Sequence, residues 1–297
     1  MFLLLAAATN AEEAAKPTPK KKAKPVVTEP THKDVSYGAH ERHKLNFWKI
    51  ESDKPTPVLV HIHGGGWLGG RKVESIRGNA LKAKYSQCSI NYRLAGTDIL
   101  PAPVMDAGRA IQFLRTKATE WNIDTDRIVC QGGSAGAASS LWLAFHADLA
   151  DPKSADPVLR ESSRIAGAIG IAGQTTLDPN VTNKIIGVAA TRHPMIWKTP
   201  GAKSMDDLVK NWEKFKALSL ECSPITHVSR DDPPVYLKYS NNTPVPVTKG
   251  DGIHHVGFGR LLKEKCDEVG VECTLELTGG KKPKFNSSEF MSRIFFK

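Results

Sequence analysis

A serine within a glycine-rich pentapeptide is the residue of this chain with the clearest chemical potential. Gly132-Gly133-Ser134-Ala135-Gly136 follows an apolar run and has the pattern G-x-S-x-G, which in enzymes exposes a serine hydroxyl on a sharp turn between a strand and a helix. A serine hydroxyl is a weak nucleophile until a positioned base takes its proton. The pattern predicts acyl transfer at Ser134, provided that another residue supplies this base.

A second glycine-rich stretch, His63-Gly64-Gly65-Gly66-Trp67, also follows an apolar run. Three consecutive glycines allow backbone N–H groups to approach a substrate oxygen closely and to form an oxyanion hole. Either stretch alone is also typical of an ordinary turn. Both together, in this order and about 70 residues apart, indicate a hydrolase-type pocket.

Short apolar strands alternate with helices from about residue 44 onward. Strands are expected at 56–62, 88–94, 122–133, 164–173, 233–240 and 271–280, and helices at 104–121, 134–150 and 257–270. This alternation predicts an α/β fold, in which a mostly parallel sheet carries helices on both faces. Residues 174–224 fit the pattern least, and we expect them to form an insertion over the sheet edge.

At this point the chain resembles the α/β-hydrolases of the hormone-sensitive-lipase-like esterase group, over about residues 36–297. The resemblance rests on four stretches, which are HGGGW at His63–Trp67, NYRL at Asn91–Leu94, PAPVMDAGRA at Pro101–Ala110 and GGSAG at Gly132–Gly136.

The resemblance implies hydrolysis of carboxylic esters, of short acyl chains or acetylated sugars, without a metal or an organic cofactor. By position, it makes Ser134 the nucleophile and makes Gly64, Gly65 and Ala135 the donors of the oxyanion hole. The expected partner is therefore a small-molecule or glycan ester.

The two remaining triad positions do not carry the residues that the resemblance calls for. In this fold the acid and then the histidine follow the serine along the chain. The acid's position, after the strand expected near residues 235–239, holds Asn242 or Thr243, and the histidine's position holds Pro283. The last histidine of the chain is His255, so the base must come from elsewhere or be missing.

Three interpretations stay open. In the first, His254 or His255 is a displaced base that Asp251 orients, although these histidines also fit the start of a surface helix. In the second, the chain is a non-catalytic homologue that binds an ester or a glycan. In the third, a frameshift or truncation altered the C-terminus, against which the amphipathic tail at 284–297 argues. Ester hydrolysis is the function that we favour, because both glycine-rich stretches are complete.

Two further polar segments lie near the expected site. Asp106 is expected to open a helix, where the dipole stabilises a carboxylate, so capping is the role that we predict for it. Asn91, Tyr92 and Arg93 lie at the end of an expected strand and are expected to anchor loops.

Composition narrows the functional classes. The chain has 297 residues, a formal net charge of +10 and five cysteines, with no C-x-x-C pair, nucleic-acid motif or long apolar run. These features argue against a zinc ribbon, a nucleic-acid partner and a membrane span. Residues 1–11 resemble the remnant of a signal peptide. Residues 12–35 resemble a Pro/Lys-rich linker. Export to the periplasm or the medium is therefore expected.

Overall fold

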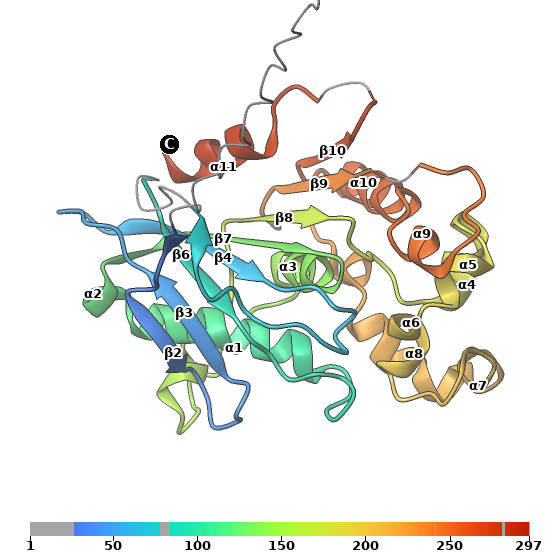
Figure 1. Ribbon diagram of the computed structural model, residues 1–297, viewed down its shortest axis with the longest axis horizontal. Helices are drawn as coiled ribbons and strands as arrows, with labels where there is room; N and C mark the ends of the chain where they lie inside the picture. Colours follow the sequence, from blue (N-terminus) through green and yellow to red (C-terminus); the bar gives the residue numbers. More distant parts are fainter. Residues whose placement is uncertain (1–26, 78–83, 241, 281–282, 297) are drawn as a thin grey trace, which may run out of the picture.

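The computed structural model describes residues 27–77, 84–240, 242–280 and 283–296. The expected signal-peptide remnant at 1–11 and residues 12–26 of the expected linker lie outside these ranges. The rest forms a layered α/β structure around one large sheet (Figure 1).

The sheet has eight strands in the order β10-β9-β8-β7-β4-β6-β3-β2. All neighbours from β10 to β6 are parallel, whereas β3 and β2 join antiparallel. The prediction of a mostly parallel sheet is confirmed. The strands are β2 (His32–Ser36), β3 (Lys44–Trp48), β4 (Thr56–Ile62), β6 (Ser86–Ile90), β7 (Ile123–Gly133), β8 (Gly167–Ile171), β9 (Val235–Tyr239) and β10 (Cys273–Leu277), with β1 (Val27–Thr28) and β5 (Ile76–Arg77) paired separately.

Helices lie on both faces of the sheet. Successive side chains of a strand point to opposite faces, so each face offers its own apolar residues for packing. In β9, Val235, Leu237 and Tyr239 join the core that contains α1, α3 and α10, whereas Tyr236 packs with Phe290 of α11. The helices of the sheet region are α1 (Ala102–Thr116), α2 (Ala118–Trp121), α3 (Ala135–Phe145), η2 (Pro157–Arg160), α9 (Lys249–Ile253), α10 (Gly257–Val269) and α11 (Ser287–Phe295).

The C-terminal tail is an ordered helix that closes the second face. Asn286 accepts hydrogen bonds from the backbone N–H groups of Ser288 and Glu289, and the Glu289 side chain accepts one from the backbone N–H of Asn286. This reciprocal capping box stabilises the start of α11. Phe290 and Phe295 are then buried against the sheet, so the tail packs as part of the fold.

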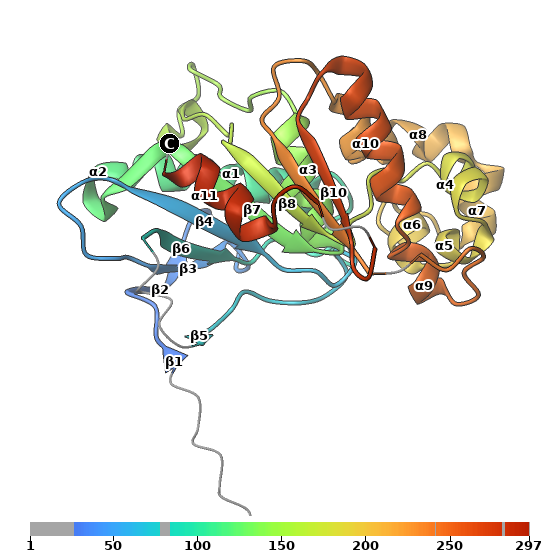
Figure 2. The same ribbon diagram turned by 90° about the horizontal axis from the view of Figure 1, so that it is seen from above.

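The segment between β8 and β9 carries a group of short helices. They are α4 (Pro179–Ile185), α5 (Val188–Thr191), α6 (Pro194–Lys198), α7 (Met205–Lys210), α8 (Trp212–Glu221) and η3 (Pro224–His227). In Figures 1 and 2, α4 to α8 gather at one end of the sheet, beside α9. We call residues 174–227 the inserted segment.

No helix in the described ranges has the length and apolarity needed to cross a membrane. The five cysteines are all buried free thiols. Burial raises the pKa of Cys88 and Cys130 well above the ordinary value, so these thiols are protonated core residues rather than nucleophiles.

Candidate active site

Ser134 occupies the turn between β7 and α3, as the pentapeptide predicted. Its φ of 55° and ψ of −124° are rarely adopted by a residue with a side chain, and such strain is typical of functional turns. The backbone N–H of Ser134 donates to the carbonyl of Ile171 at 2.9 Å, which ties the turn to β8. The side chain is partly exposed.

The flanking glycines are required by close packing. A Cβ at Gly136 would lie 2.1 Å from the carbonyl oxygen of Ile62, and a Cβ at Gly132 would lie 2.3 Å from the carbonyl carbon of Gly136. No real side chain tolerates such distances. The glycines therefore let the start of α3 press against β4, which brings the turn beside the loop that follows β4.

That loop carries Gly64 and Gly65. A Cβ at Gly64 would lie 3.5 Å from the Cβ of Ser134, so the two loops are neighbours. Gly65 has a φ of 99°, which favours glycine. Ala135 is the first residue of α3, where backbone N–H groups lack helical partners and the macrodipole is positive. The structure thus places Gly64 and Ala135 next to Ser134.

We call residues 63–67 the glycine loop. Aromatic and imidazole side chains hold it in place through hydrogen bonds. The Tyr92 hydroxyl donates to the His63 carbonyl at 2.7 Å, and Trp67 Nε1 donates to Ser139 Oγ at 2.9 Å. The His63 Nδ1 atom lies 2.8 Å from the carbonyl oxygen of Gly64, and burial lowers the pKa of His63 to about 4. The prediction that the segment at Asn91–Arg93 anchors loops is confirmed.

Of the two adjacent histidines, the structure brings His254 to the serine. His254 Nε2 lies 3.0 Å from Ser134 Oγ. Burial lowers the pKa of His254, although a hydrogen bond with the backbone of Gly250 acts in the opposite direction. The ring is therefore neutral at neutral pH, which is the state that a general base needs.

His255 points elsewhere and holds the surrounding loop together. Its Nε2 lies 2.9 Å from the carbonyl oxygen of Thr243, and its Nδ1 accepts a hydrogen bond from the backbone N–H of Gly257. Because Thr243 O can only accept, Nε2 is the protonated nitrogen. Both ring nitrogens are therefore engaged with backbone groups, and the ring is buried.

Contacts with the inserted segment position His254. The buried Gln174 side chain donates to the carbonyl of Ile253 at 2.6 Å. A Cβ at Gly252 would lie 2.3 Å from the backbone nitrogen of Ala190, so α9 packs directly against α5. The location of His254 thus depends on residues far away in the sequence.

Asp251 takes part in the N-terminal cap of α9. Thr248 Oγ1 donates to Asp251 Oδ2 at 2.7 Å, and the backbone N–H of Asp251 donates to Thr248 Oγ1 at 3.1 Å. Burial lowers the pKa of the His254 ring, and it is the interaction with the Gly250 backbone that acts to raise it.

Asn242 and Thr243, at the expected position of the acid, make structural contacts. Asn242 Oδ1 accepts a hydrogen bond from the Arg260 guanidinium at 2.8 Å, and the Thr243 carbonyl binds His255. Pro283 lies near Glu276 and the start of α11.

Sequence reasoning missed His193, which belongs to the inserted segment. A Cβ at Gly66 would lie 3.5 Å from His193 Cε1, which places this ring beside the glycine loop. Burial and then the nearby His254 lower the pKa of His193 to about 4. Its Nδ1 caps α6 by accepting from the backbone N–H of Met195 at 3.2 Å. No motif surrounds it, so only tertiary packing reveals it.

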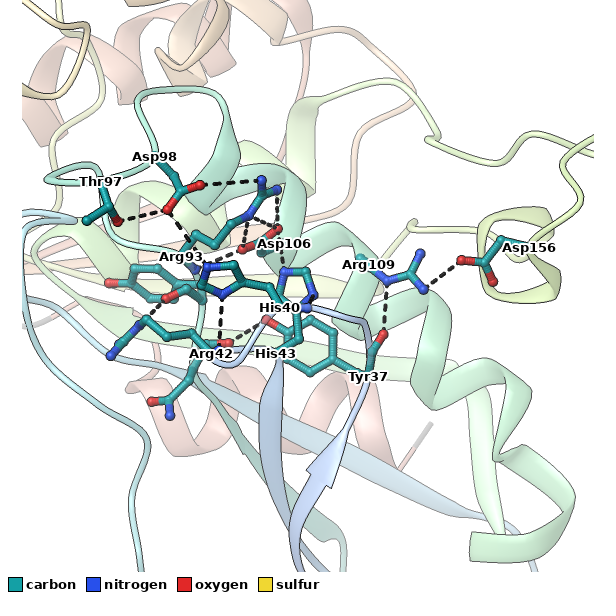
Figure 3. Close-up of polar contacts among 12 residues, drawn as sticks. Tyr37, His40, Arg42, His43, Arg93, Thr97, Asp98, Asp106, Arg109 and Asp156 are labelled. Carbon is teal, nitrogen blue, oxygen red and sulfur yellow. Dashed lines mark hydrogen bonds and ion pairs between the residues drawn. The ribbon is translucent and has the colours of Figure 1, made fainter.

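The expectation that Asp106 caps a helix is wrong. The helix α1 begins at Ala102, so Asp106 lies in its second turn. Its carboxylate accepts hydrogen bonds from the backbone and guanidinium of Arg93 and pairs with His43 at 3.0 Å (Figure 3). Burial alone raises the pKa of Asp106, but these bonds outweigh it and the pKa is lowered. Asp106 is thus an ionised anchor for the segment after β6.

A family model described as BD-FAE matches residues 47–255, well over half of the chain. The chain therefore belongs to the BD-FAE family, and the matched region includes both Ser134 and His254.

The curated relatives are esterases. The chain is 26% identical over 230 residues to the probable carboxylic ester hydrolase LipM of Mycobacterium tuberculosis, covering 74% of this chain and 50% of that protein. It is 37% identical over 101 residues to the carboxylesterase NlhH of the same organism, covering 33% of this chain and 32% of that protein. The chain spans about half the length, or less, of these relatives. The resemblance to hormone-sensitive-lipase-like esterases is confirmed.

Solved structures agree on the fold. A truncated carbohydrate esterase from gut microbiota superposes with a TM-score of 0.62 at 20% identity, over 85% of this chain and 91% of that one. An acetyl ester-xyloside bifunctional hydrolase from Caldicellulosiruptor lactoaceticus superposes with a TM-score of 0.55 at 22% identity, over 79% and 76% of the two chains. The α/β-hydrolase fold is confirmed.

Proposed function

We propose that this member of the BD-FAE family hydrolyses carboxylic esters, with Ser134 as the nucleophile and His254 as the general base. The observation that carries the proposal is the 3.0 Å distance between His254 Nε2 and Ser134 Oγ, which is within reach for proton transfer. The lowered pKa of His254 supports the same role, because it keeps Nε2 unprotonated at neutral pH.

The reaction then proceeds in two halves. Ser134 Oγ attacks the acyl carbon while His254 Nε2 takes its proton, and the carbonyl oxygen becomes an oxyanion. The backbone N–H groups of Gly64, Gly65 and Ala135 stabilise this oxyanion. The intermediate collapses, and the alcohol leaves with the proton from His254. A water molecule, deprotonated by His254, then releases the acid and restores Ser134.

The Gly250 backbone replaces part of what a triad aspartate does. We propose that the imidazole donates to the Gly250 carbonyl, which agrees with the raising effect of the Gly250 backbone on the pKa of His254. This bond keeps the proton off Nε2, so the ring is in the tautomer that accepts the serine proton. A neutral carbonyl stabilises the imidazolium less than a carboxylate does, so we expect slower turnover than in a complete triad.

The proposed substrates are short acyl esters, including acetylated sugars. Two structural neighbours carry the names carbohydrate esterase and acetyl ester-xyloside hydrolase, and these names support the choice of acetyl esters as first substrates. Acetylated xylo-oligosaccharides and an activated acetate ester are the compounds to test.

The decisive experiment combines labelling with rate measurement. Wild type should react with a fluorophosphonate at Ser134, as peptide mapping would show, and Ser134→Ala should not. His254→Ala should lower kcat for an activated acetate by about 10²–10⁴-fold. The matched control His255→Ala, which changes the adjacent histidine, should lose much less.

The alternative is a binding homologue, which is favoured by the lack of an orienting aspartate at the usual position. A folded wild type that is neither labelled nor active, but that binds acetylated oligosaccharides, would replace the esterase proposal with this one.

We also propose that the protein is exported, because residues 1–11 resemble the apolar part of a signal peptide. Fractionation of cells that express the chain, with a cytoplasmic marker as control, would test this. Recovery with the cytoplasmic marker would contradict it.

A further inference from the structure

Two imidazoles and a carboxylate converge at the end of α3 opposite Ser134. His146 follows the last residue of α3, Glu221 is the last residue of α8, and His227 is the last residue of η3. One possible ligand atom from each lies within 4.8 Å of the others. Three separate elements therefore supply a set of side chains that metal ions favour.

Backbone carbonyls orient both imidazoles. His146 Nδ1 lies 2.8 Å from the carbonyl oxygen of Ala147, and His227 Nε2 lies 2.6 Å from the carbonyl oxygen of Glu221. Since a carbonyl only accepts, these two nitrogens carry protons, which leaves the other nitrogen of each ring to bind a metal ion. Metal-binding histidines are oriented in this way by a hydrogen bond from the nitrogen that does not bind the metal.

The contact between His146 and Glu221 also favours a cation. His146 Nε2 lies 3.0 Å from Glu221 Oε1, and a metal ion bound between them would take a lone pair from each atom. Ligand atoms around a tetrahedral zinc are about 3.3 Å apart, given bonds near 2.0 Å, so this pair already has nearly the required spacing.

The surroundings are suited to a positive charge. The Trp142 ring stacks on His146 with centroids 4.0 Å apart, and its Nε1 donates to the Glu221 carbonyl at 2.7 Å. This ring shields one side of the cluster from water. The C-terminal ends of α3 and α8 both meet here, and the negative ends of helix macrodipoles favour cations.

From this geometry we propose that His146, Glu221 and His227 bind one zinc ion, with a water molecule as the fourth ligand. Two imidazoles and a carboxylate are ligands that zinc prefers among the common divalent metals. The helix α3 has 11 residues and so spans about 16 Å, which separates this site from Ser134. The zinc fastens the end of the inserted segment to α3 and takes no part in ester hydrolysis.

Zinc binding is tested on tag-free protein that has been dialysed against a chelator. Calorimetric titration should give one zinc per chain. At a free zinc concentration of 100 times Kd, the melting temperature should rise by about 4 °C, as expected for a ligand that binds only the folded chain. Cobalt in place of zinc should show the intense visible absorption of a four-coordinate site.

Single substitutions of the three proposed ligands test where the zinc ion binds. His146→Ala, His227→Ala and the nearly isosteric Glu221→Gln should each weaken zinc binding by about 100-fold or more and remove the thermal shift. His40→Ala, at a partly exposed histidine paired with Asp98, is the matched control and should bind zinc like wild type. Glu221→Gln preserves the shape of the side chain, so the test remains valid if an alanine variant does not fold.

Two results would overturn the proposal. One is the absence of zinc binding by folded wild type up to millimolar zinc. The other is binding that persists in His146→Ala and Glu221→Gln but disappears in His254→Ala, which would place the ion at the serine site instead.

Discussion

The two sides of the serine site are built in different ways. On one side, the turn at Ser134 and the loop at Gly64 follow adjacent parallel strands, β7 and β4, and are shaped by glycines that allow backbone to touch backbone. On the other side, His254 directly follows the short helix α9. Gln174, which bonds to the Ile253 carbonyl, and the packing of Gly252 hold this helix in place. The first side is local and rigid, whereas the second is assembled from distant segments.

This difference separates a part of the site that is fixed by backbone contacts from a part that depends on the packing of distant segments. The glycine side cannot move, because a single Cβ would collide with the backbone of β4. The histidine only has to deliver Nε2 to a fixed point, and any loop at the carboxyl end of the sheet that reaches Ser134 can do so. In the proposed site the segment after β9, which includes α9, delivers His254.

The largest effect is expected on the rigid side. Gly136→Ala would place a Cβ 2.1 Å from the Ile62 carbonyl oxygen and should destabilise the protein by more than about 4 kcal/mol, as severe overlaps in a core do. Urea unfolding and soluble yield would measure this. The matched control is Gly96→Ala, because no atom lies within 4 Å of its added Cβ. A Gly136→Ala protein as stable as this control would contradict the proposed packing.

A substitution on the His254 side should lower activity more than it lowers stability. Gly252→Ala places a Cβ 2.3 Å from the backbone nitrogen of Ala190 and should push α9 away from α5, which displaces His254. A shift of about 1 Å can cost about 10² in rate, so kcat should fall by about that factor. Rate and melting temperature should be measured together, again beside Gly96→Ala. Unchanged kcat with a displaced or destabilised α9 would argue against His254 as the base.

The pH dependence should report the buried base. Burial lowers the pKa of His254 below 6.5, and the neutral ring is the active form. The value of kcat/KM should therefore stay constant down to below pH 6.5 and then fall about tenfold per pH unit under the pKa. A profile for ester hydrolysis between pH 4 and pH 8, in buffers of constant ionic strength, would show it. An inflection above pH 6.5 would contradict the lowered pKa of His254.

The smallest effect is expected at Asp251. Its carboxylate accepts from Thr248 in the cap of α9, so Asp251→Asn, which keeps an acceptor there, should change kcat by less than about threefold. The loss of an orienting triad aspartate costs about 10⁴. A loss of 100-fold or more would therefore show that Asp251, rather than the Gly250 carbonyl, orients His254.

Much of the fold was predictable because its strands and helix ends follow from short local patterns in the sequence. Apolar runs such as Val58–Ile62 form buried parallel strands, and Gly270, with a φ of 84°, ends α10 where the sequence places it. The start of α1 was predicted less well, because the helix begins at Ala102, two residues before the expected start, and Asp106 lies in its second turn. As a result Asp106 faces Arg93 and His43, partners that helix-capping rules do not consider.

The amino-acid sequence by itself located the proposed nucleophile and its glycine loop, since both depend on backbone conformation and on the absence of side chains within two short stretches. It also named two adjacent histidines as candidates for a displaced base. Only the tertiary structure decided between them, by turning His254 toward Ser134 and bonding His255 to Thr243 and Gly257. The same holds for His193 and for the cluster of His146, Glu221 and His227. These side chains meet through packing between elements that are far apart along the chain, and spacing in a sequence carries no record of such contacts.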